Sequence, residues 1–295
     1  MIQKKSFGDR VFDLVNGLLL TVVAVCTLYP MLYVVFASFS EPYLFKAHDF
    51  LLLWKPLGFQ LGTYRLLFRN ASLVRSFGNT LFYTAAGTAI SMFVTLLGAY
   101  ALSRRGYTFR RGITLLIMFT MYFGGGLVPT YLWVSQLKLI DTVWAILLPN
   151  MLSTYNLIVM RTAFEAVPAS LEESARMDGA NDFVILFRIM LPLCLPTFAV
   201  VAMFYGVGRW NEWFNAVIYL NQRTLFPMQL ILREILITAS DSYVADQGGD
   251  PGSMEATREL LKYAAIVVTT LPILCVYPFI QKYFVKGMML GAVKG

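Results

Sequence analysis

Side chains that could bind a metal or carry out redox or acid–base chemistry are few in this sequence and far apart. The one histidine, His48, has no other histidine or cysteine nearby, and the three cysteines are Cys26, Cys194 and Cys275. Zinc and iron–sulfur sites need several such ligands at fixed spacings. The sequence therefore predicts no catalytic residue and no metal site, and we expect the cysteines to be free thiols inside apolar helices.

A site for nucleotide hydrolysis is missing as well. A phosphate-binding P-loop needs a Gly-Lys pair followed by Ser or Thr. The 295 residues contain no Gly-Lys pair. We therefore expect a chain that is not an enzyme and that binds no cofactor of its own.

The most structured polar feature is SLEESARMDGANDFVILFRIMLP at Ser170–Pro192, which interrupts an apolar part of the chain. Ser170 and Glu173 have the spacing of a capping box, which predicts a helix that begins at Leu171. Acidic residues in its first turn suit the positive end of the helix dipole. Gly179 is the expected C-terminal stop, so this helix should be short.

A second short helix is predicted directly after the glycine. Asn181 can cap it, and Pro192 fits the first turn of the helix that follows. Its apolar residues recur at helical spacing: Phe183, Leu186, Phe187 and Met190. Two short helices joined at a glycine, with carboxylates and Arg176 on the outer side, make a rigid docking shape.

The rest of the sequence is that of a membrane protein. Its residues are 58% hydrophobic and 14% charged, against roughly 25% charged in soluble domains. Six runs of 19 to 28 residues contain no charged residue, and a membrane-spanning helix needs about 20 apolar residues. We therefore predict one all-α transmembrane domain over residues 1–295, with six spans at approximately 12–39, 76–102, 112–136, 142–161, 189–208 and 262–281.

The basic residues indicate the orientation of these spans. With the N-terminus in the cytoplasm, 13 of the 24 basic residues fall in cytoplasmic segments, and the short outer turn holds only Lys138. This is the positive-inside pattern. We expect both termini inside, the two short helices at 168–188 on the cytoplasmic face and an outer loop at 209–260. The net charge of +7 then records topology and indicates no nucleic-acid partner.

The uncharged runs bear on the class of transporter. Proton- or sodium-coupled carriers usually place Asp, Glu or His inside their spans, because a coupling ion needs a charge to neutralise. None of the six runs contains such a residue. The pattern argues against an independent secondary transporter.

A break is expected in the third span. Gly124, Gly125 and Gly126 weaken a helix and Pro129 removes a backbone hydrogen bond, which predicts a kink or an unwound turn. The glycines could serve close helix packing or a backbone that lines a water-filled path, and the sequence favours neither. Aromatic residues beside the break could stack on sugar rings or form an interfacial belt: Tyr122, Phe123, Tyr131 and Trp133.

The outer loop divides into two parts. The first, RWNEWFNAVIYLNQRTLFPMQLILREI, mixes aromatic and polar residues, as interfacial or cavity-lining segments do. The second, TASDSYVADQGGDPGSMEATRE, is polar, Gly-rich and acidic, so it can bury little apolar surface. It is either a solvated connection or a loop that docks on an external partner, and composition alone favours the connection.

The segment around Gly179 resembles the EAA loop of binding-protein-dependent ABC importer permeases. It has ESA at 173–175, three residues, Gly179, nine residues and IMLP at 189–192. Ser174 stands where the family usually has alanine, a small residue like serine. In that family the loop carries the helix that fits a groove of the ATPase subunit. The resemblance implies these coupling residues: Ser170, Glu172, Glu173, Ser174, Ala175, Arg176, Asp178, Gly179 and Ala180.

The resemblance covers essentially the whole chain. GAYALSR and WNEWFNAVIYL look like the carbohydrate branch, specifically the maltose-type second permease. MYFGGGLVPTYLWVSQLKLIDTVWAILLPN and the ending KGMMLGAVKG resemble a subgroup that imports larger or acidic oligosaccharides such as alginate. This implies a type I ABC importer permease fold in the cytoplasmic (inner) membrane. It also implies a second homologous permease, two ATPase subunits that bind ATP and Mg, an extracytoplasmic binding protein and an oligosaccharide substrate.

The maltose-type resemblance also places two sites. Its loop between the last two helices reaches into the binding protein, which implies a docking loop at Asp241, Gln247, Gly248, Gly249, Asp250 and Gly252. Its short C-terminal tail approaches the ATPases, which implies a contact at Lys294 and Gly295. In that family most sugar contacts belong to the other permease. We expect a translocation path walled by Tyr122, Phe123, Gly124, Tyr131, Trp133, Asn150, Tyr155, Trp210, Asn211 and Trp213.

Two alternatives stay open. One is an ABC importer permease for a non-sugar solute, which the carbohydrate-type motifs argue against. The other is an independent secondary transporter or channel, which the uncharged runs and the docking shape argue against. The residues identify neither the sugar nor its length.

Overall fold

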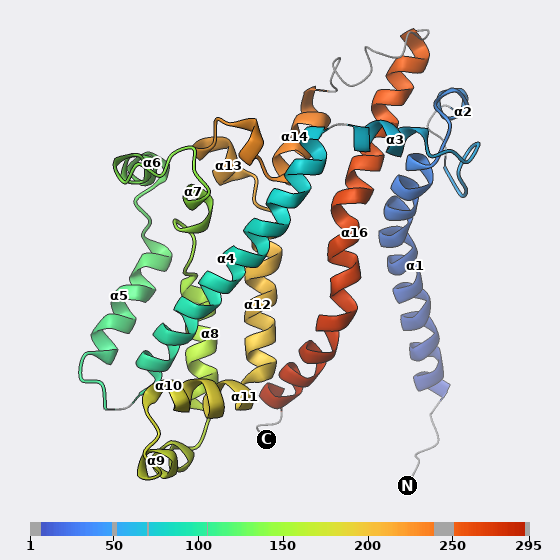
Figure 1. The fold of residues 1–295 in the computed structure, drawn as a ribbon. Coiled ribbons are helices and arrows are strands. Elements are labelled where there is room, and N and C mark those ends of the chain that lie inside the picture. Colours follow the sequence, from blue (N-terminus) through green and yellow to red (C-terminus); the bar gives the residue numbers. More distant parts are fainter. Residues whose placement is uncertain (1–6, 49–51, 70, 105, 239–250, 293–295) are drawn as a thin grey trace. The chain divides into compact units, whose positions relative to one another are not determined.

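The computed structural model describes residues 7–48, 52–69, 71–104, 106–238 and 251–292, and side chains are not described for 251–254, 277 and 279–292. Throughout these ranges the regular structure is helical, with no strand (Figure 1). The chain forms two compact units. The first comprises Met1–Asn70 with Leu232–Thr270, and the second comprises Ala71–Ile231 with Leu271–Gly295.

The first unit contains α1 (Phe7–Ser38), α2 (Pro42–Ala47), α3 (Gly62–Arg69) and the beginning of α16 (Pro251–Ala292). Its core is a small cluster in which Ala37, Phe45, Leu53 and Leu260 are buried. Most apolar side chains of α1 have no such cover, and no residue of its most apolar window is buried inside the chain. A helix that is apolar all round and exposed suits a lipid environment.

Three helices form the centre of the second unit: α4 (Ala71–Ser103), α8 (Thr154–Glu165) and α12 (Leu195–Trp210). α4 packs against both of the others (Figure 1). Glycine permits this close approach, because a Cβ at Gly98 would lie 3.0 Å from Leu157 of α8. Where α4 packs against α12, the hydroxyls of Thr95 and Tyr205 are 2.7 Å apart.

The remaining elements of the second unit are short. They are α5 (Arg110–Tyr122), α6 (Leu127–Gln136), α7 (Trp144–Leu147), α9 (Ala169–Met177), α10 (Asp182–Val184), the π turn η1 (Ile185–Met190), α11 (Leu191–Leu193), α13 (Phe214–Tyr219) and the 3-10 turn η2 (Arg223–Leu225). The division between the two units falls inside α14 (Met228–Thr238) and inside α16.

The structure offers three to five candidate spans in its described residues, and the six predicted spans are not confirmed. Three helices in the described residues are long and apolar enough to cross a membrane, at Phe7–Ser38, Ala71–Ser103 and Glu255–Val276. Two bent pairs, Arg110–Tyr122 with Leu127–Gln136 and Asp182–Leu193 with Leu195–Trp210, raise the number to five if each pair is one span. Six spans and the orientation of the termini stay predictions.

The run predicted as a span at 142–161 is not one helix. α7 ends at Leu147, and α8 begins only at Thr154. Pro149 lies in this gap, and proline has no N–H to continue a helix. Ser153 then caps α8 by accepting a hydrogen bond from the Asn156 N–H. This apolar run therefore contains a helix break that hydropathy alone does not detect.

The predicted break in the third apolar run is confirmed. α5 ends at Tyr122, α6 begins at Leu127, and the two are bent by 114°. Gly126 has φ +86°, a conformation that suits glycine. A Cβ built on Gly124 or Gly126 would meet nothing within 4 Å. These two glycines therefore serve the backbone turn and not close packing inside this chain.

The first part of the predicted outer loop folds onto α4. The Asn79 side chain donates to the carbonyls of Thr224 and Phe226, at 2.8 and 3.0 Å. The Thr80 hydroxyl, which is fully buried, accepts the N–H of Met228 at 2.7 Å. The segment therefore forms regular helical elements, namely α13, η2 and the start of α14, whereas the sequence predicted a loop from 209 to 260.

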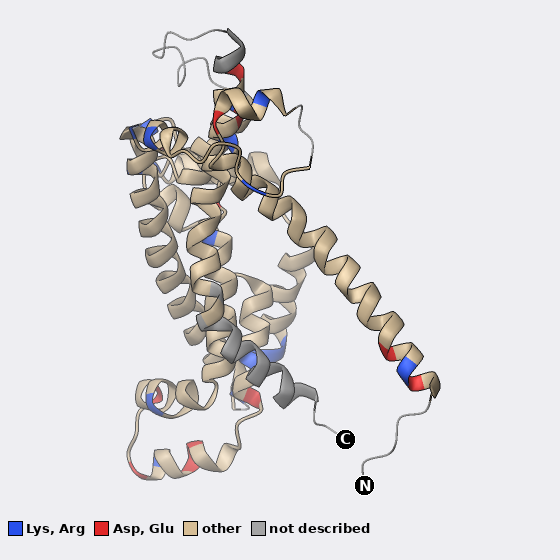
Figure 2. Cartoon of the chain, turned by 90° about the vertical axis from the view of Figure 1, so that its right-hand side faces the viewer, with Lys and Arg blue, Asp and Glu red and all other residues tan. Residues whose placement is uncertain are grey.

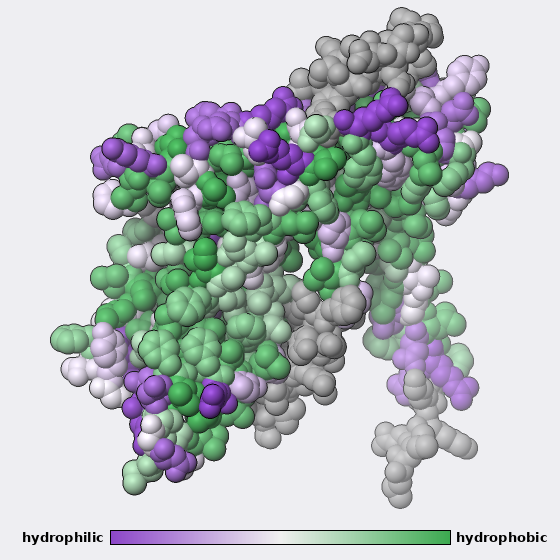
Figure 3. Space-filling view, in the orientation of Figure 1, coloured by the Kyte–Doolittle hydropathy of each residue, from purple (hydrophilic) through white to green (hydrophobic). Residues whose placement is uncertain are grey.

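Charged residues and apolar surface occupy different parts of the second unit. Lys, Arg, Asp and Glu gather mostly near the ends of its helices (Figure 2). The space-filling view shows a largely hydrophobic wall between more hydrophilic margins (Figure 3). Many large apolar side chains on this unit are exposed, Leu115, Leu116 and Phe119 of α5 among them. Such a surface needs lipid or a protein partner to cover it.

Candidate functional sites

The helix of the polar segment begins earlier than the capping-box prediction placed it. α9 starts at Ala169, its N-cap position is Pro168, and no side chain caps it. The prediction that Ser170 caps a helix starting at Leu171 is wrong. Proline presets the backbone and has no N–H to leave unpaired, so the helix can begin immediately after Pro168 without a polar cap.

The predicted stop at Gly179 is confirmed in detail. Gly179 has φ +81° and donates its N–H to the carbonyl of Arg176 at 3.0 Å. The Ala180 N–H reaches the carbonyl of Ala175 at 2.9 Å. These two bonds form a Schellman motif, which satisfies carbonyls that a helix end otherwise leaves unpaired.

The second helix starts as predicted and ends later. The Asn181 side chain accepts the Val184 N–H at 2.9 Å, which confirms the cap. The helix then runs from Asp182 through Pro192 to Leu193, and the next helix leaves it at 91°. Pro192 therefore does not start the following span. The proline ring crowds the carbonyl four residues back, and the wide π turn η1 (Ile185–Met190) lies directly before it.

One face of this helix pair is anchored in the second unit's core. Ala175, Ile185, Leu186 and Met190 are buried in one cluster with residues of α4 and α8. Met177, Leu171 and Phe183 are exposed instead, with 89%, 44% and 62% of their surface accessible. A surface helix pair with apolar side chains left uncovered is a candidate docking face.

Charged side chains tie the helix pair to the end of α4. Glu172 makes ion pairs with Arg104 and with Arg176, the latter at 3.0 Å. Asp182 accepts from Arg176 and from the Tyr100 hydroxyl, at 2.5 and 3.1 Å. The Arg104 guanidinium lies 4.7 Å from the centre of the Tyr100 ring. These five residues are called the α4–α9 network below.

Burial governs the electrostatics of this network. Burial lowers the pKa of Arg104 from its ordinary value, but an arginine stays charged in water-exposed or buried settings alike. The Arg104 and Glu172 side chains keep only 20% and 15% of their surface exposed. Ion pairs so far withdrawn from solvent are screened less by salt than surface pairs. The Arg104–Glu172 pair is therefore the least solvent-exposed ionic link between α9 and the end of α4.

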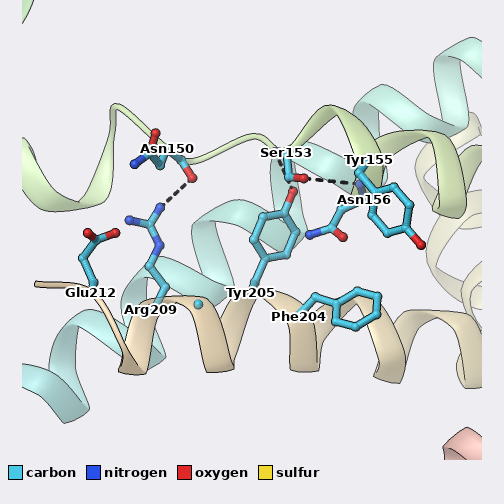
Figure 4. A pocket seen from close by; sticks show the side chains of 9 residues that line it. Asn150, Ser153, Tyr155, Asn156, Phe204, Tyr205, Arg209 and Glu212 are labelled. Carbon is cyan, nitrogen blue, oxygen red and sulfur yellow. Dashed lines mark hydrogen bonds between the residues drawn. The ribbon is translucent and has the colours of Figure 1, made fainter. Parts of the chain in front are cut away.

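A second site is a cavity of about 420 Å³ between the α7–α8 connection and α12. Its walls appear in Figure 4. It is lined by Asn150, Ser153, Tyr155, Asn156, Phe204, Tyr205, Gly208, Arg209 and Glu212. Its size lies within the range of small-molecule sites, about 300–1,000 Å³.

Arg209 holds this cavity together. Its side chain is 4% exposed and donates to the carbonyls of Ile146, Leu147 and Asn150, at 2.6, 3.1 and 2.9 Å. The carbonyls of Ile146 and Leu147 belong to the end of α7, where a helix leaves acceptors unpaired and favours a cation. The Tyr205 hydroxyl adds a bond from the Ser153 N–H at 3.0 Å.

The comparisons with known proteins follow this geometry. Residues 112–290 match the family described as binding-protein-dependent transport system inner membrane component. The chain belongs to this family.

Two relatives from Bacillus subtilis (strain 168) match the permease nearly end to end. One is the polygalacturonan/rhamnogalacturonan transport system permease protein YtcP, 42% identical over 97% of this chain and 99% of that protein. The other is Protein LplC, 40% identical over 98% and 96%. Among solved structures, a bacterial ABC transporter involved in the import of the acidic polysaccharide alginate matches with a TM-score of 0.88. It is 33% identical and covers 95% of this chain and 99% of that one.

The predicted coupling residues of the permease lie in four different settings. Glu172 and Arg176 belong to the α4–α9 network, and Ala175 is buried in the core. Ala180 is half-buried, and the turn residue Gly179 is exposed. Side chains facing solvent are Ser170, Glu173, Ser174 and Asp178. Tyr100, Arg104 and Asp182 were missed, and the basic turn SRRGYTFRR was the signal that could have found Arg104.

The predicted walls of the path are only partly brought together. Asn150 and Tyr155 line the cavity. Trp210 is buried against Phe77 instead, and Asn211 bonds back to the carbonyl of Val207. The others are not among the residues that line it: Tyr122, Phe123, Gly124, Tyr131, Trp133 and Trp213.

The two charged residues missed in the cavity trace to one assumption about the spans. Arg209 and Glu212 lie just past the uncharged run at 189–208, and α12 extends to Trp210. The spans are therefore not free of charge, because Arg209 lies buried in the last turn of α12. The sequence signal that could have revealed Arg209 and Glu212 was GRWNE, which directly follows an apolar run.

The predicted docking loop lies mostly beyond what the structure covers. Asp241, Gln247, Gly248, Gly249 and Asp250 are outside the described residues, and so are Lys294 and Gly295. Gly252 falls in the first turn of α16, which begins at Pro251 and not near residue 262. The roles of these residues stay predictions. No group of three or more Cys, His, Asp or Glu in the described ranges could hold a metal ion.

Proposed function

We propose that this chain is a transmembrane subunit of an ATP-driven importer for oligosaccharides, acidic polysaccharide fragments in particular. An extracytoplasmic binding protein delivers the substrate. A second homologous permease completes the path, and two ATPase subunits hydrolyse ATP with Mg. The chain spans the cytoplasmic (inner) membrane six times, with both termini inside.

The observation that carries the coupling role is the α9 helix pair. It is stopped by a Schellman turn at Gly179, anchored on one face and exposed at Met177 and Phe183 on another. The α4–α9 network supports transmission, because motion of α9 acts directly on the end of α4. ATP-driven closure of the partner ATPases would then move α4 through this link.

The substrate class rests on the relatives. A similar protein is named as a polygalacturonan/rhamnogalacturonan permease, and a similar solved structure takes part in the import of alginate. A third relative, from Halalkalibacterium halodurans, is named as an arabinooligosaccharide permease at 26% identity. All three names concern saccharides of more than one unit, and two of them concern acidic polysaccharides.

The test of the coupling role uses the complete complex in proteoliposomes. Gly179→Pro breaks the turn, and Glu173→Lys reverses an exposed charge on α9, so each abolishes substrate-stimulated ATPase activity. Gln136→Lys, an exposed change on α6, leaves the stimulation intact. Normal stimulation in both α9 variants would refute the coupling role.

Uptake assays address the substrate and the alternative classes. Galacturonan, alginate and arabinan oligosaccharides are supplied with the cognate binding protein, and amino acids and peptides serve as non-sugar controls. We expect uptake of oligosaccharides only, and only with ATP. Transport by the purified chain alone in liposomes would instead establish an independent channel or carrier.

A further inference from the structure

The cavity beside α12 has the side chains of a sugar site. Tyr155 and Phe204 stand on opposite walls, 54% and 40% exposed, with ring centroids 6.2 Å apart and planes tilted by 56°. Figure 4 shows both rings at the same end of the cavity. Exposed aromatic faces with a few convergent polar groups are typical of small-ligand pockets.

The polar groups deeper in the cavity are available for a ligand. Asn156 is 5% exposed and lines the cavity. Its side-chain amide offers two donors and an acceptor. Glu212 adds a carboxylate, which accepts the Asn215 N–H at 3.3 Å. Donors and acceptors together match sugar hydroxyls, which both donate and accept.

The charge of the cavity decides which part of a sugar it can bind. Arg209 is its one basic residue, and three of its N–H bonds go to backbone carbonyls. Glu212 lies beside it and offsets its charge (Figure 4). No free cation among these lining residues is left to pair with a carboxylate. A uronate group would therefore find no free cation here to pair with its carboxylate.

We propose that this cavity is a subsite on this subunit for one ring of the transported oligosaccharide. It stacks the ring on Tyr155 and Phe204, binds its hydroxyls through Asn156 and Glu212, and does not select for its carboxylate. The inference rests on the proposed import of oligosaccharides. Selection for acidic substrates then belongs to another component of the complex.

Gly208 offers a way to close the cavity without disturbing the packing. It is exposed on the cavity wall, and a Cβ there would meet nothing within 4 Å. Gly208→Leu should therefore fill the cavity while α12 keeps its contacts. Gly78→Leu is the matched control, since Gly78 is an exposed helical glycine of α4 with equally open surroundings and no place in the cavity.

The experiment measures uptake and ATPase activity of the complete complex in proteoliposomes. The probes are a galacturonic-acid trisaccharide and its carboxyl-reduced galactose counterpart. Gly208→Leu lowers uptake of each probe that the wild type imports by about tenfold or more, while stimulation of the ATPase by the binding protein persists. Gly78→Leu leaves uptake unchanged. Size-exclusion profiles confirm that both variants assemble.

Two further variants test the chemistry without filling the space. Asn156→Ala and Glu212→Gln lower uptake of both probes, and the ratio between acidic and reduced probe stays within about twofold of the wild type. Uptake within twofold of the wild type in all three cavity variants overturns the subsite. A tenfold change in the ratio overturns the claim that the carboxylate is not selected here.

The two proposals fail in distinguishable ways. If the wild-type complex imports no oligosaccharide with ATP and binding protein, the proposed function fails and the subsite fails with it. If the wild type imports normally and the cavity variants do too, only the subsite fails.

Discussion

At the residue scale, Arg209 shows how a charge can be accommodated at the end of an apolar helix. Its guanidinium replaces water at the carbonyls that end α7, and Gly87 of α4 makes room for it, because a Cβ there would lie 3.0 Å from Arg209 Nε. Three hydrogen bonds to carbonyl oxygens satisfy the donors of this buried charge, and the carboxylate of Glu212 lies beside it. The result is a fixed connection between α12 and the α7–α8 segment.

We expect Arg209→Ala to destabilise the permease. The free energy of unfolding should fall by about 1–3 kcal/mol, since the substitution leaves buried carbonyls unpaired. Thermal unfolding in detergent measures this, with Arg111→Ala at an exposed position of α5 as the control. An unchanged melting temperature for Arg209→Ala would contradict the structural role given to the guanidinium.

Gly179 makes a separate prediction about conformation. A Cβ there meets no atom within 4 Å, so the cost of Gly179→Ala comes from its φ of +81° alone. A left-handed residue other than glycine costs about 1–2 kcal/mol, and asparagine tolerates this region better than alanine. Stability should therefore rank glycine above asparagine above alanine, whereas Gly106→Ala should be neutral. Equal stability of all three residues at 179 would argue against a strained turn.

At the element scale, the link between α9 and α4 is electrostatic as well as apolar. Arg104→Glu puts a carboxylate opposite that of Glu172, with Asp182 nearby. The repulsion should release α9 from α4 and reduce substrate-stimulated ATPase activity. Glu172→Arg should do the same by clustering cations with Arg104 and Arg176.

The charge-swapped double variant distinguishes the Arg104–Glu172 interaction from the effects of neighbouring charges. Arg104→Glu with Glu172→Arg restores an opposite-charge contact, so stimulated ATPase activity should recover above either single variant. A coupling energy of about 0.5–3 kcal/mol is usual for residues in contact. Additive losses in the double variant would mean that this pair does not join α9 to α4.

At the scale of the whole molecule, the proposed orientation puts α9 and both termini inside the cell. Met177, 89% exposed at the end of α9, and Leu137, 51% exposed after α6, are suitable labelling positions. In a background that lacks the native cysteines, Met177→Cys should react with a membrane-impermeant thiol reagent only from the cytoplasmic side. Leu137→Cys should react only from outside. Reversal of the two patterns would overturn the positive-inside assignment.

Local signals in the sequence were sufficient for the features that depend on neighbouring residues. Gly179 stops α9 and Asn181 caps the next helix because both turns are held by bonds between residues at most five positions apart. The glycines at 124–126 break their helix for the same reason. Where two local signals competed, as at Ser170 and Pro168, the sequence alone chose the wrong start.

The tertiary structure decided what depends on distant residues. Arg209 contacts carbonyls about 60 positions earlier, and Tyr100 reaches Asp182 across 82 positions. No local pattern encodes such pairs, because they exist only once α4, α8 and α12 have packed. The sequence by itself therefore determined the membrane class, the family resemblance and the short helix that ends before Gly179. Only the fold could bring a buried arginine, the amide of Asn156 and two exposed rings around one cavity.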